Sequence, residues 1–155
     1  MVALRKDAVL VVDDEPAVLE SFIAILEDRF NVLVASSGSE AMEIITREAP
    51  WLAFIDVRLP DSSGLELLKR VKDVSPDTVV IMETAYADLD DAMKSIRLGA
   101  SDYIIKPFEV SEVETAVEAA SERRLTPIRR EDLMQRWRLG RRNLMSRALS
   151  TYAFA

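Results

Sequence analysis

Carboxylate, hydroxyl and ammonium side chains stand at or just beyond the ends of short apolar runs in this sequence. They are Asp13, Asp14, Asp56, Thr84 and Lys106. Carboxylates brought close together repel one another, and a hard divalent cation such as Mg2+ neutralises them through the oxygen ligands it prefers. An ammonium and a hydroxyl group opposite them suit a phosphoryl group, because its charge is spread over three oxygens. Gathered at one place, these side chains predict phosphoryl transfer onto a carboxylate.

Five short apolar runs are predicted to be the strands that position these side chains, and they are 8–12, 31–35, 51–55, 78–82 and 102–105. Their near-continuous apolarity is typical of parallel strands covered on both faces. Segments with apolar residues at helical spacing follow them, at 16–28, 38–48, 64–72, 89–98 and 111–124. Helix start signals agree with this pattern, namely capping boxes at Ser37 with Glu40 and at Ser111 with Glu114, and Pro16 in a first turn.

The five strand-then-helix repeats predict an α/β fold with a doubly wound, five-stranded parallel sheet of the flavodoxin-like kind. In such sheets the functional crevice lies outside the carboxyl ends of the strands. The polar side chains named above are therefore expected at one edge. Each of them alone is as well explained by helix capping, a strand exit or simple solvation. Reactive groups at four strand ends out of five are hard to explain by capping.

The amino-acid composition excludes some metal ligands and some partners. The chain has no Cys and no His, so thiolate and imidazole ligands are excluded and any metal must be held by oxygen. No run of 18 apolar residues occurs, and a cytoplasmic location without a membrane contact is expected. Residues 1–120 carry a net charge of −13 and residues 121–155 a net charge of +6. The acidic body is not expected to bind nucleic acid directly, because that requires clustered Lys and Arg.

We interpret residues 1–122 as one domain and residues 123–155 as a basic C-terminal linker or helix. From Glu131 onward, apolar residues recur at helical spacing and indicate an amphipathic helix. Three uses of this tail stay open. It packs or dimerises, which we favour; it links to an output domain beyond Ala155; or it binds nucleic acid, which its arginines permit but no base-reading motif supports.

Four stretches of the sequence resemble the motifs of response regulator receiver domains in order and spacing. They are Val-Val-Asp-Asp-Glu-Pro at 11–16, the stretch from Asp56 to Leu68, Thr-Ala-Tyr-Ala-Asp at 84–88, and the stretch from Gly99 to Phe108. The resemblance spans about residues 7–122. It is closest to receivers of enhancer-binding transcriptional activators, in which residues like Arg58 and Tyr86 are common at these positions.

The resemblance implies roles for individual residues. Asp56 is the expected phosphoacceptor, and Mg2+ is expected to be held by the carboxylates of Asp13, Asp14 and Asp56 and the backbone carbonyl of Arg58. Thr84 and Lys106 are expected to bind the phosphoryl group, with a cis peptide bond between Lys106 and Pro107. Tyr103 is expected to be a rotating aromatic switch. Arg58 and Tyr86 are expected to shield the phosphoryl group from water and so lengthen its lifetime.

The function implied is that of a two-component signalling module. A histidine kinase is expected to donate the phosphoryl group, and the phosphorylated form is expected to change self-association or partner binding. The homodimer implied uses the face of the fourth helix, fifth strand and fifth helix, and the output is transcription or another response, through a partner or a further domain. The chain is not expected to be a metabolic enzyme, although it catalyses its own phosphorylation and dephosphorylation.

Two other classes of protein share parts of this pattern. A stand-alone phosphohydrolase with an aspartyl-phosphate intermediate would carry a second aspartate two residues after its nucleophile, where Arg58 stands and offers no general acid. A flavin-binding electron carrier would hold phosphate in a first loop rich in hydroxyl groups and glycine, whereas this loop reads Asp-Asp-Glu and repels phosphate.

One residue departs from the receiver pattern. Glu83 stands just before Thr84, where the family usually has an apolar residue in a central strand. An unpaired carboxylate buried there would be costly. We therefore expect Glu83 either to reach solvent at the strand end or to pair with an arginine, including one from the tail.

Overall fold

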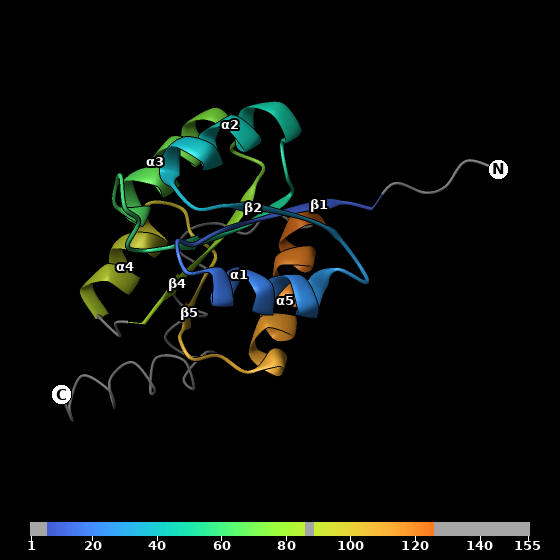
Figure 1. Ribbon diagram of the computed structural model, residues 1–155. Coiled ribbons are helices and arrows are strands. Elements are labelled where there is room, and N and C mark those ends of the chain that lie inside the picture. Colours follow the sequence, from blue (N-terminus) through green and yellow to red (C-terminus); the bar gives the residue numbers. More distant parts are fainter. Residues whose placement is uncertain (1–5, 86–88, 126–155) are drawn as a thin grey trace, which may run out of the picture.

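The computed structural model describes residues 6–85 and 89–125, in which a single parallel sheet carries helices on both of its faces (Figure 1). The strands are Ala8–Val12 (β1), Asn31–Ala35 (β2), Leu52–Asp56 (β3), Val79–Thr84 (β4) and Asp102–Ile105 (β5). The helices are Pro16–Leu26 (α1), Gly38–Glu48 (α2), Gly64–Val74 (α3), Leu89–Arg97 (α4) and Val110–Leu125 (α5). The strand order is β2-β1-β3-β4-β5, which confirms the predicted doubly wound sheet.

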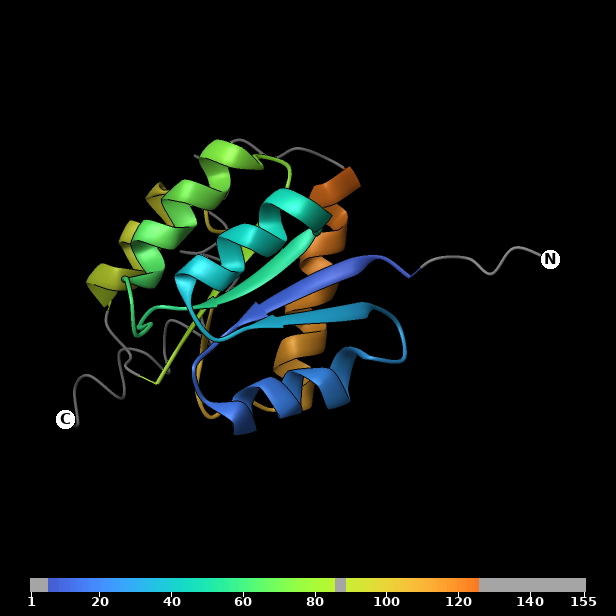
Figure 2. The ribbon, with the colours of Figure 1, turned by 45° about the horizontal axis from the view of Figure 1, so that its top comes forward.

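Both faces of the sheet bury apolar side chains. Helices α1 and α5 cover one face and α2, α3 and α4 cover the other (Figure 2). Successive strand residues point to opposite faces, so Phe54 packs with Phe22 on the α1/α5 side while Ile55 packs with Leu68 on the α3 side. All five residues of β3 are buried, which explains why the strand sequences are apolar without alternation.

Two strands extend one or two residues further than their apolar runs predict. Asp56 is the last residue of β3 and Thr84 is the last residue of β4, so both are held in the ladder itself. The register pairs Asp56 with Glu83, and the Val57 N–H donates to the Glu83 carbonyl at 2.9 Å. The reactive residues at this edge therefore take their backbone positions from the sheet.

Of the two capping boxes predicted from the sequence, the structure confirms the N-cap at Ser37 and not the one at Ser111. The Ser37 hydroxyl accepts from the Glu40 N–H as the N-cap of α2, and Pro16 opens α1 as predicted. The capping box at Ser111 is wrong, because α5 already begins at Val110 and Ser111 lies inside the helix. Helix α5 also continues past residue 122, where the domain was expected to end.

The predicted tail helix from Glu131 lies outside the described residues. Within residues 6–85 and 89–125, no helix combines the length and the apolar character that crossing a membrane requires.

Candidate functional site

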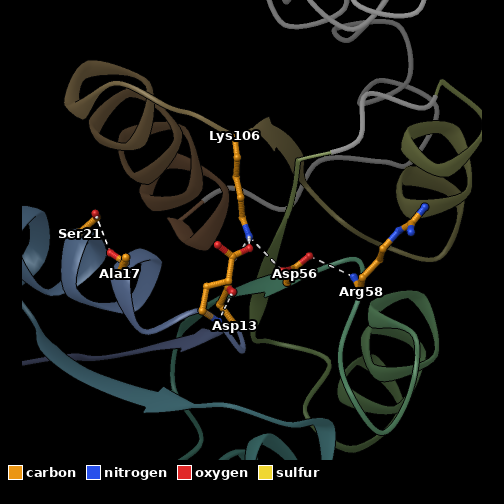
Figure 3. Close-up of polar contacts among 7 residues, drawn as sticks. Asp13, Ala17, Ser21, Asp56, Arg58 and Lys106 are labelled. Atoms are coloured by element: carbon orange, nitrogen blue, oxygen red, sulfur yellow. Dashed lines mark hydrogen bonds and ion pairs between the residues drawn. The ribbon is translucent and has the colours of Figure 1, made fainter. Parts of the chain in front are cut away.

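The carboxyl ends of β1, β3 and β5 bring three charged side chains into contact (Figure 3). Asp13 directly follows β1, Asp56 ends β3, and Lys106 directly follows β5. The Lys106 Nζ lies 2.5 Å from Asp13 Oδ2 and 2.9 Å from Asp56 Oδ2. Residues 93 and 50 positions apart in the sequence thus meet at the one edge where the sequence predicted them.

This cluster is largely shielded from solvent, which strengthens its electrostatics. Asp13 is fully buried and Asp56 is 6% exposed. Burial opposes the charge on Lys106, but its hydrogen bonds to Asp13 and Asp56 outweigh that effect and raise the pKa of the ammonium group above its ordinary value. Burial raises the pKa of Asp56, against the hydrogen bonds from the Arg58 N–H and from Lys106. Lys106 therefore keeps its positive charge at neutral pH.

The pocket offers a set of oxygen ligands to a cation. One carboxylate oxygen from each of Asp13, Asp14, Glu15 and Asp56 lies within 4.8 Å of the others. All are hard ligands of the kind that Mg2+ prefers. Asp14 and Glu15 are exposed, so solvent water reaches the pocket from their side, while Asp13 and Asp56 are buried. The donor set therefore fits Mg2+. Glu15 was not among the predicted ligands, although the Asp-Asp-Glu run contained the signal.

Glu15 also contributes to the pocket in two other ways. Its backbone N–H donates to Asp13 Oδ1 at 2.9 Å, and its carboxylate lies 3.8 Å from the Lys106 Nζ.

The loop after Asp56 holds the acceptor carboxylate in place. The Arg58 N–H donates to Asp56 Oδ1 at 3.0 Å, and the Gly64 N–H donates to the Val57 carbonyl at 2.7 Å. The Arg58 guanidinium is exposed and points away from Asp56 (Figure 3). Its shielding role therefore stays a prediction, and Tyr86 lies outside the described residues.

Asp61 ties this same loop to α2. Its two carboxylate oxygens accept from the Gly38 N–H at 2.9 Å and the Ser39 N–H at 3.0 Å, at the helix N-terminus where backbone N–H groups lack partners. These two hydrogen bonds lower the pKa of Asp61 below its ordinary value of 3.8. The loop that follows the acceptor is thus linked to a neighbouring helix by a contact that sequence reasoning missed.

We expect Asp61→Asn to lower the melting temperature at neutral pH and to remove a pH dependence. A carboxylate with a lowered folded-state pKa stabilises the protein above its unfolded value, and that stabilisation is lost as the pH falls through the folded value. The gap between the melting temperatures of wild type and variant should therefore narrow below about pH 3.8. Asp73→Asn, an exposed carboxylate in α3, is the charge-matched control. A gap of the same size at pH 7 and pH 2 would contradict the capping role.

Thr84 and Tyr103 occupy the side of the pocket formed by β4 and β5. Both are buried, with exposed fractions of 1% and 2%. The Lys106 N–H donates to the Thr84 carbonyl at 2.7 Å, and the Lys106–Pro107 peptide bond is cis, as expected. The Tyr103 side chain is thus turned inward, and its role as a rotating switch stays a prediction.

Glu83 does not lie at a solvated strand end, and pairing with an arginine from residues 126–155 stays a prediction because those residues lie outside the described part of the chain. Its side chain is fully buried, so the interpretation as a solvated strand end is wrong. No donor from an arginine in the described part of the chain reaches its carboxylate oxygens. Burial, followed by contact with Asp13, raises its pKa well above the ordinary value.

The family comparison agrees with this geometry. Residues 9–118 match the family model for the response regulator receiver domain. The chain is 32% identical over 115 residues to sporulation initiation phosphotransferase F of Bacillus subtilis, covering 74% of this chain and 93% of that protein. It is 35% identical over 118 residues to the response regulator protein PilR of Pseudomonas aeruginosa, covering 76% of this chain and 26% of that protein.

A solved structure shows the same fold. The beryllofluoride-activated NtrC4 receiver domain dimer superposes with a TM-score of 0.72 at 35% identity, covering 76% of this chain and 98% of that one. The chain therefore belongs to the response regulator receiver domain family of two-component signalling proteins. It spans nearly the whole of one relative but only about a quarter of PilR, so the activities of the longer proteins are not assigned to it.

Proposed function

We propose that Asp56 accepts a phosphoryl group from a histidine kinase and that the phosphorylated chain changes its self-association. The observation that supports this most directly is the Lys106 ammonium group, which contacts Asp13 and Asp56 at the strand ends. Asp13, Asp14, Asp56 and the Arg58 carbonyl are the proposed Mg2+ ligands. Mg2+ would supply charge neutralisation for the incoming phosphoryl oxygens. The chain acts as a signalling module, with chemistry limited to its own acceptor.

Asp56, Lys106 and Thr84 each have one proposed role in the phosphoryl transfer. A carboxylate oxygen of Asp56 forms the bond to phosphorus as the bond to the donor breaks. Lys106 moves from Asp56 Oδ2 to a phosphoryl oxygen, which its permanent charge allows. Thr84, at the end of the neighbouring strand, donates a hydrogen bond from its hydroxyl group to another phosphoryl oxygen.

Movement of Thr84 towards the phosphoryl group is the proposed start of the output signal. It changes the packing around Tyr103, which then stabilises one of two positions of a bistable element. The signal is proposed to leave through the face formed by α4, β5 and α5, which lies at the edge of the sheet. Exposed Lys94 and Arg97 on α4 and exposed Glu118 and Glu122 on α5 offer charges of opposite sign to a second copy. Similarity to an activated receiver dimer supports this proposal.

We expect beryllofluoride with Mg2+ to promote dimerisation of the full chain, and deletion of residues 126–155 to change that association without preventing modification of Asp56. Sedimentation velocity with and without beryllofluoride measures the first effect and intact mass after acetyl phosphate measures the second. Lys94→Glu should weaken the dimer by about 1 kcal/mol, and Lys69→Glu, an exposed residue on α3, should not. Equal association of the full and truncated chains in both states would show that the tail is passive.

A further inference from the structure

A second pocket lies at the opposite edge of the sheet from the phosphoacceptor, and we call it the amino-edge pocket. The residues that line it include Trp51, which directly precedes the strand that Asp56 ends, Lys72 in the last turn of α3, and Arg123 and Arg124 in the last turn of α5. Its volume is about 720 Å³. Pockets that hold small molecules commonly enclose roughly 300–1,000 Å³. The amino-edge pocket is therefore large enough for a ligand of its own.

The side chains of this pocket carry an excess of positive charge, although the chain has a net charge of -7. Among the described residues, Lys72, Arg123 and Arg124 line it together with one carboxylate, that of Asp77. Burial lowers the pKa of Lys72, and the neighbouring charge of Arg123 lowers it further, by more than Asp77 raises it. The pocket therefore has a positive potential that its own carboxylate does not cancel.

The ends of the helices explain part of this charge and still leave donors for a ligand. Basic side chains are favoured near helix C-termini, and the Lys72 Nζ donates to the carbonyls of Pro76 at 2.9 Å and Thr78 at 2.7 Å. The Arg124 guanidinium donates from Nη1 to Asp7 Oδ2 at 3.0 Å. An ammonium group and a guanidinium group each have more N–H donors than these contacts use. Lys72 and Arg124 can therefore serve the fold and a ligand at the same time.

Trp51 places an unsatisfied hydrogen-bond donor at the wall of the pocket. The residue is 8% exposed, and in the part of the chain that the structure describes its Nε1 has no hydrogen-bond partner. A buried indole N–H group usually has an acceptor. The Arg124 Cζ lies 5.0 Å from the centre of the Trp51 ring, which places a cation beside this indole. An anionic acceptor would satisfy the donor and the positive charge together.

We propose that the amino-edge pocket binds a small organic phosphate, with its phosphate group among Lys72, Arg123 and Arg124. The three positive charges less the single negative charge of Asp77 leave the lining with +2. A phosphate monoester carries roughly -1.5 to -2 at pH 7, which matches that excess. Arginine forks and lysine ammonium groups both bind phosphate oxygens. The pocket is also much larger than a phosphate ion, so it has space for the organic part.

The test follows the indole N–H signal of Trp51 in nitrogen–proton correlation NMR spectra of the full chain, with phenyl phosphate and inorganic phosphate as probes. The sequence has two tryptophans, and Trp51→Phe assigns the signal. Both titrations are made without Mg2+, so that the phosphoacceptor pocket lacks its proposed cation. We expect a saturable shift with phenyl phosphate and weaker binding of inorganic phosphate, because the phenyl group adds contacts with the wall of the pocket.

Three variants locate the binding site. Arg123→Gln and Arg124→Gln should each weaken phenyl phosphate binding roughly 10-fold, because each removes a charged hydrogen-bond donor. Arg97→Gln removes the same charge from the last turn of α4, outside the lining of the pocket, and should stay within about 2-fold of wild type. The other signals in each spectrum show whether the variant is folded.

Asp56→Asn separates the amino-edge pocket from the phosphoacceptor, and it should bind phenyl phosphate as wild type does. Weaker binding in that variant would place the probe at the phosphoacceptor and overturn the proposal. The absence of a saturable shift with either probe would also overturn it, as would equal losses in Arg97→Gln and Arg123→Gln, because the effect would then come from net charge. Equal affinity for the two probes would contradict an organic phosphate and leave a site for a simple anion.

Discussion

The Asp56→Asn chain should keep its unmodified mass in acetyl phosphate and Mg2+, whereas wild type should gain one phosphoryl group. Asparagine has a neutral side-chain amide, so it lacks the anionic carboxylate oxygen that attacks phosphorus. Among the acidic residues of the pocket, Asp56 combines a nearly buried position with a direct contact to Lys106 and a loop that fixes it through the Arg58 N–H. We expect complete loss of labelling, measured by intact-protein mass spectrometry.

Two variants make this result specific. Asp61→Asn changes another carboxylate of the same loop and should still be labelled, because Asp61 caps α2 and does not contact Lys106. Beryllofluoride should raise the melting temperature of wild type and Asp61→Asn but not of Asp56→Asn, because a ligand that binds only the folded state stabilises it. Labelling of Asp56→Asn at the wild-type level would show that another residue is the acceptor.

The sequence predicts the sheet and the position of the acceptor because both depend on local patterns. Apolar runs identify the strands, and parallel topology places their carboxyl ends together without knowledge of any side-chain contact. The contact between Lys106 and Asp56 follows from that rule and the structure confirms it.

The features that the sequence did not predict are mainly contacts between residues that are distant in the chain. Glu83 looks like a strand-end carboxylate in the sequence, and only the pairing of β4 with β3 and the side on which Asp13 lies show that it is buried in the pocket. The contact of Asp61 with Gly38 joins residues 23 positions apart and leaves no local signal. The start of α5 was misplaced by one residue because Ser111 and Glu114 have the right spacing for a cap, while the chain had already turned into the helix at Val110.

Gly64→Ala should destabilise the domain by about 3 kcal/mol, because the first residue of α3 lies against the backbone of the acceptor. A Cβ on Gly64 would lie 2.0 Å from the Asp56 carbonyl oxygen and 2.7 Å from the Val57 Cα. Neither atom can rotate away, since β3 is paired on both sides and the Gly64 N–H is bonded to the Val57 carbonyl. Helix α3 or the acceptor must therefore shift. Urea unfolding measures the cost, and labelling by acetyl phosphate should also slow.

Gly38→Ala is the matched control for this prediction. Its Cβ would meet the Ser62 Oγ at 2.6 Å, which is the end of a side chain that can turn aside. We expect that variant to lose less than about 1 kcal/mol of unfolding free energy and to be labelled at the wild-type rate. The contrast isolates one cause, because both changes add a methyl group at the first residue of a helix and only one of them presses on Asp56. Equal losses of unfolding free energy in the two variants would contradict the prediction, because they would mean that the backbone at Asp56 and Val57 shifts at little cost to make room for the methyl group.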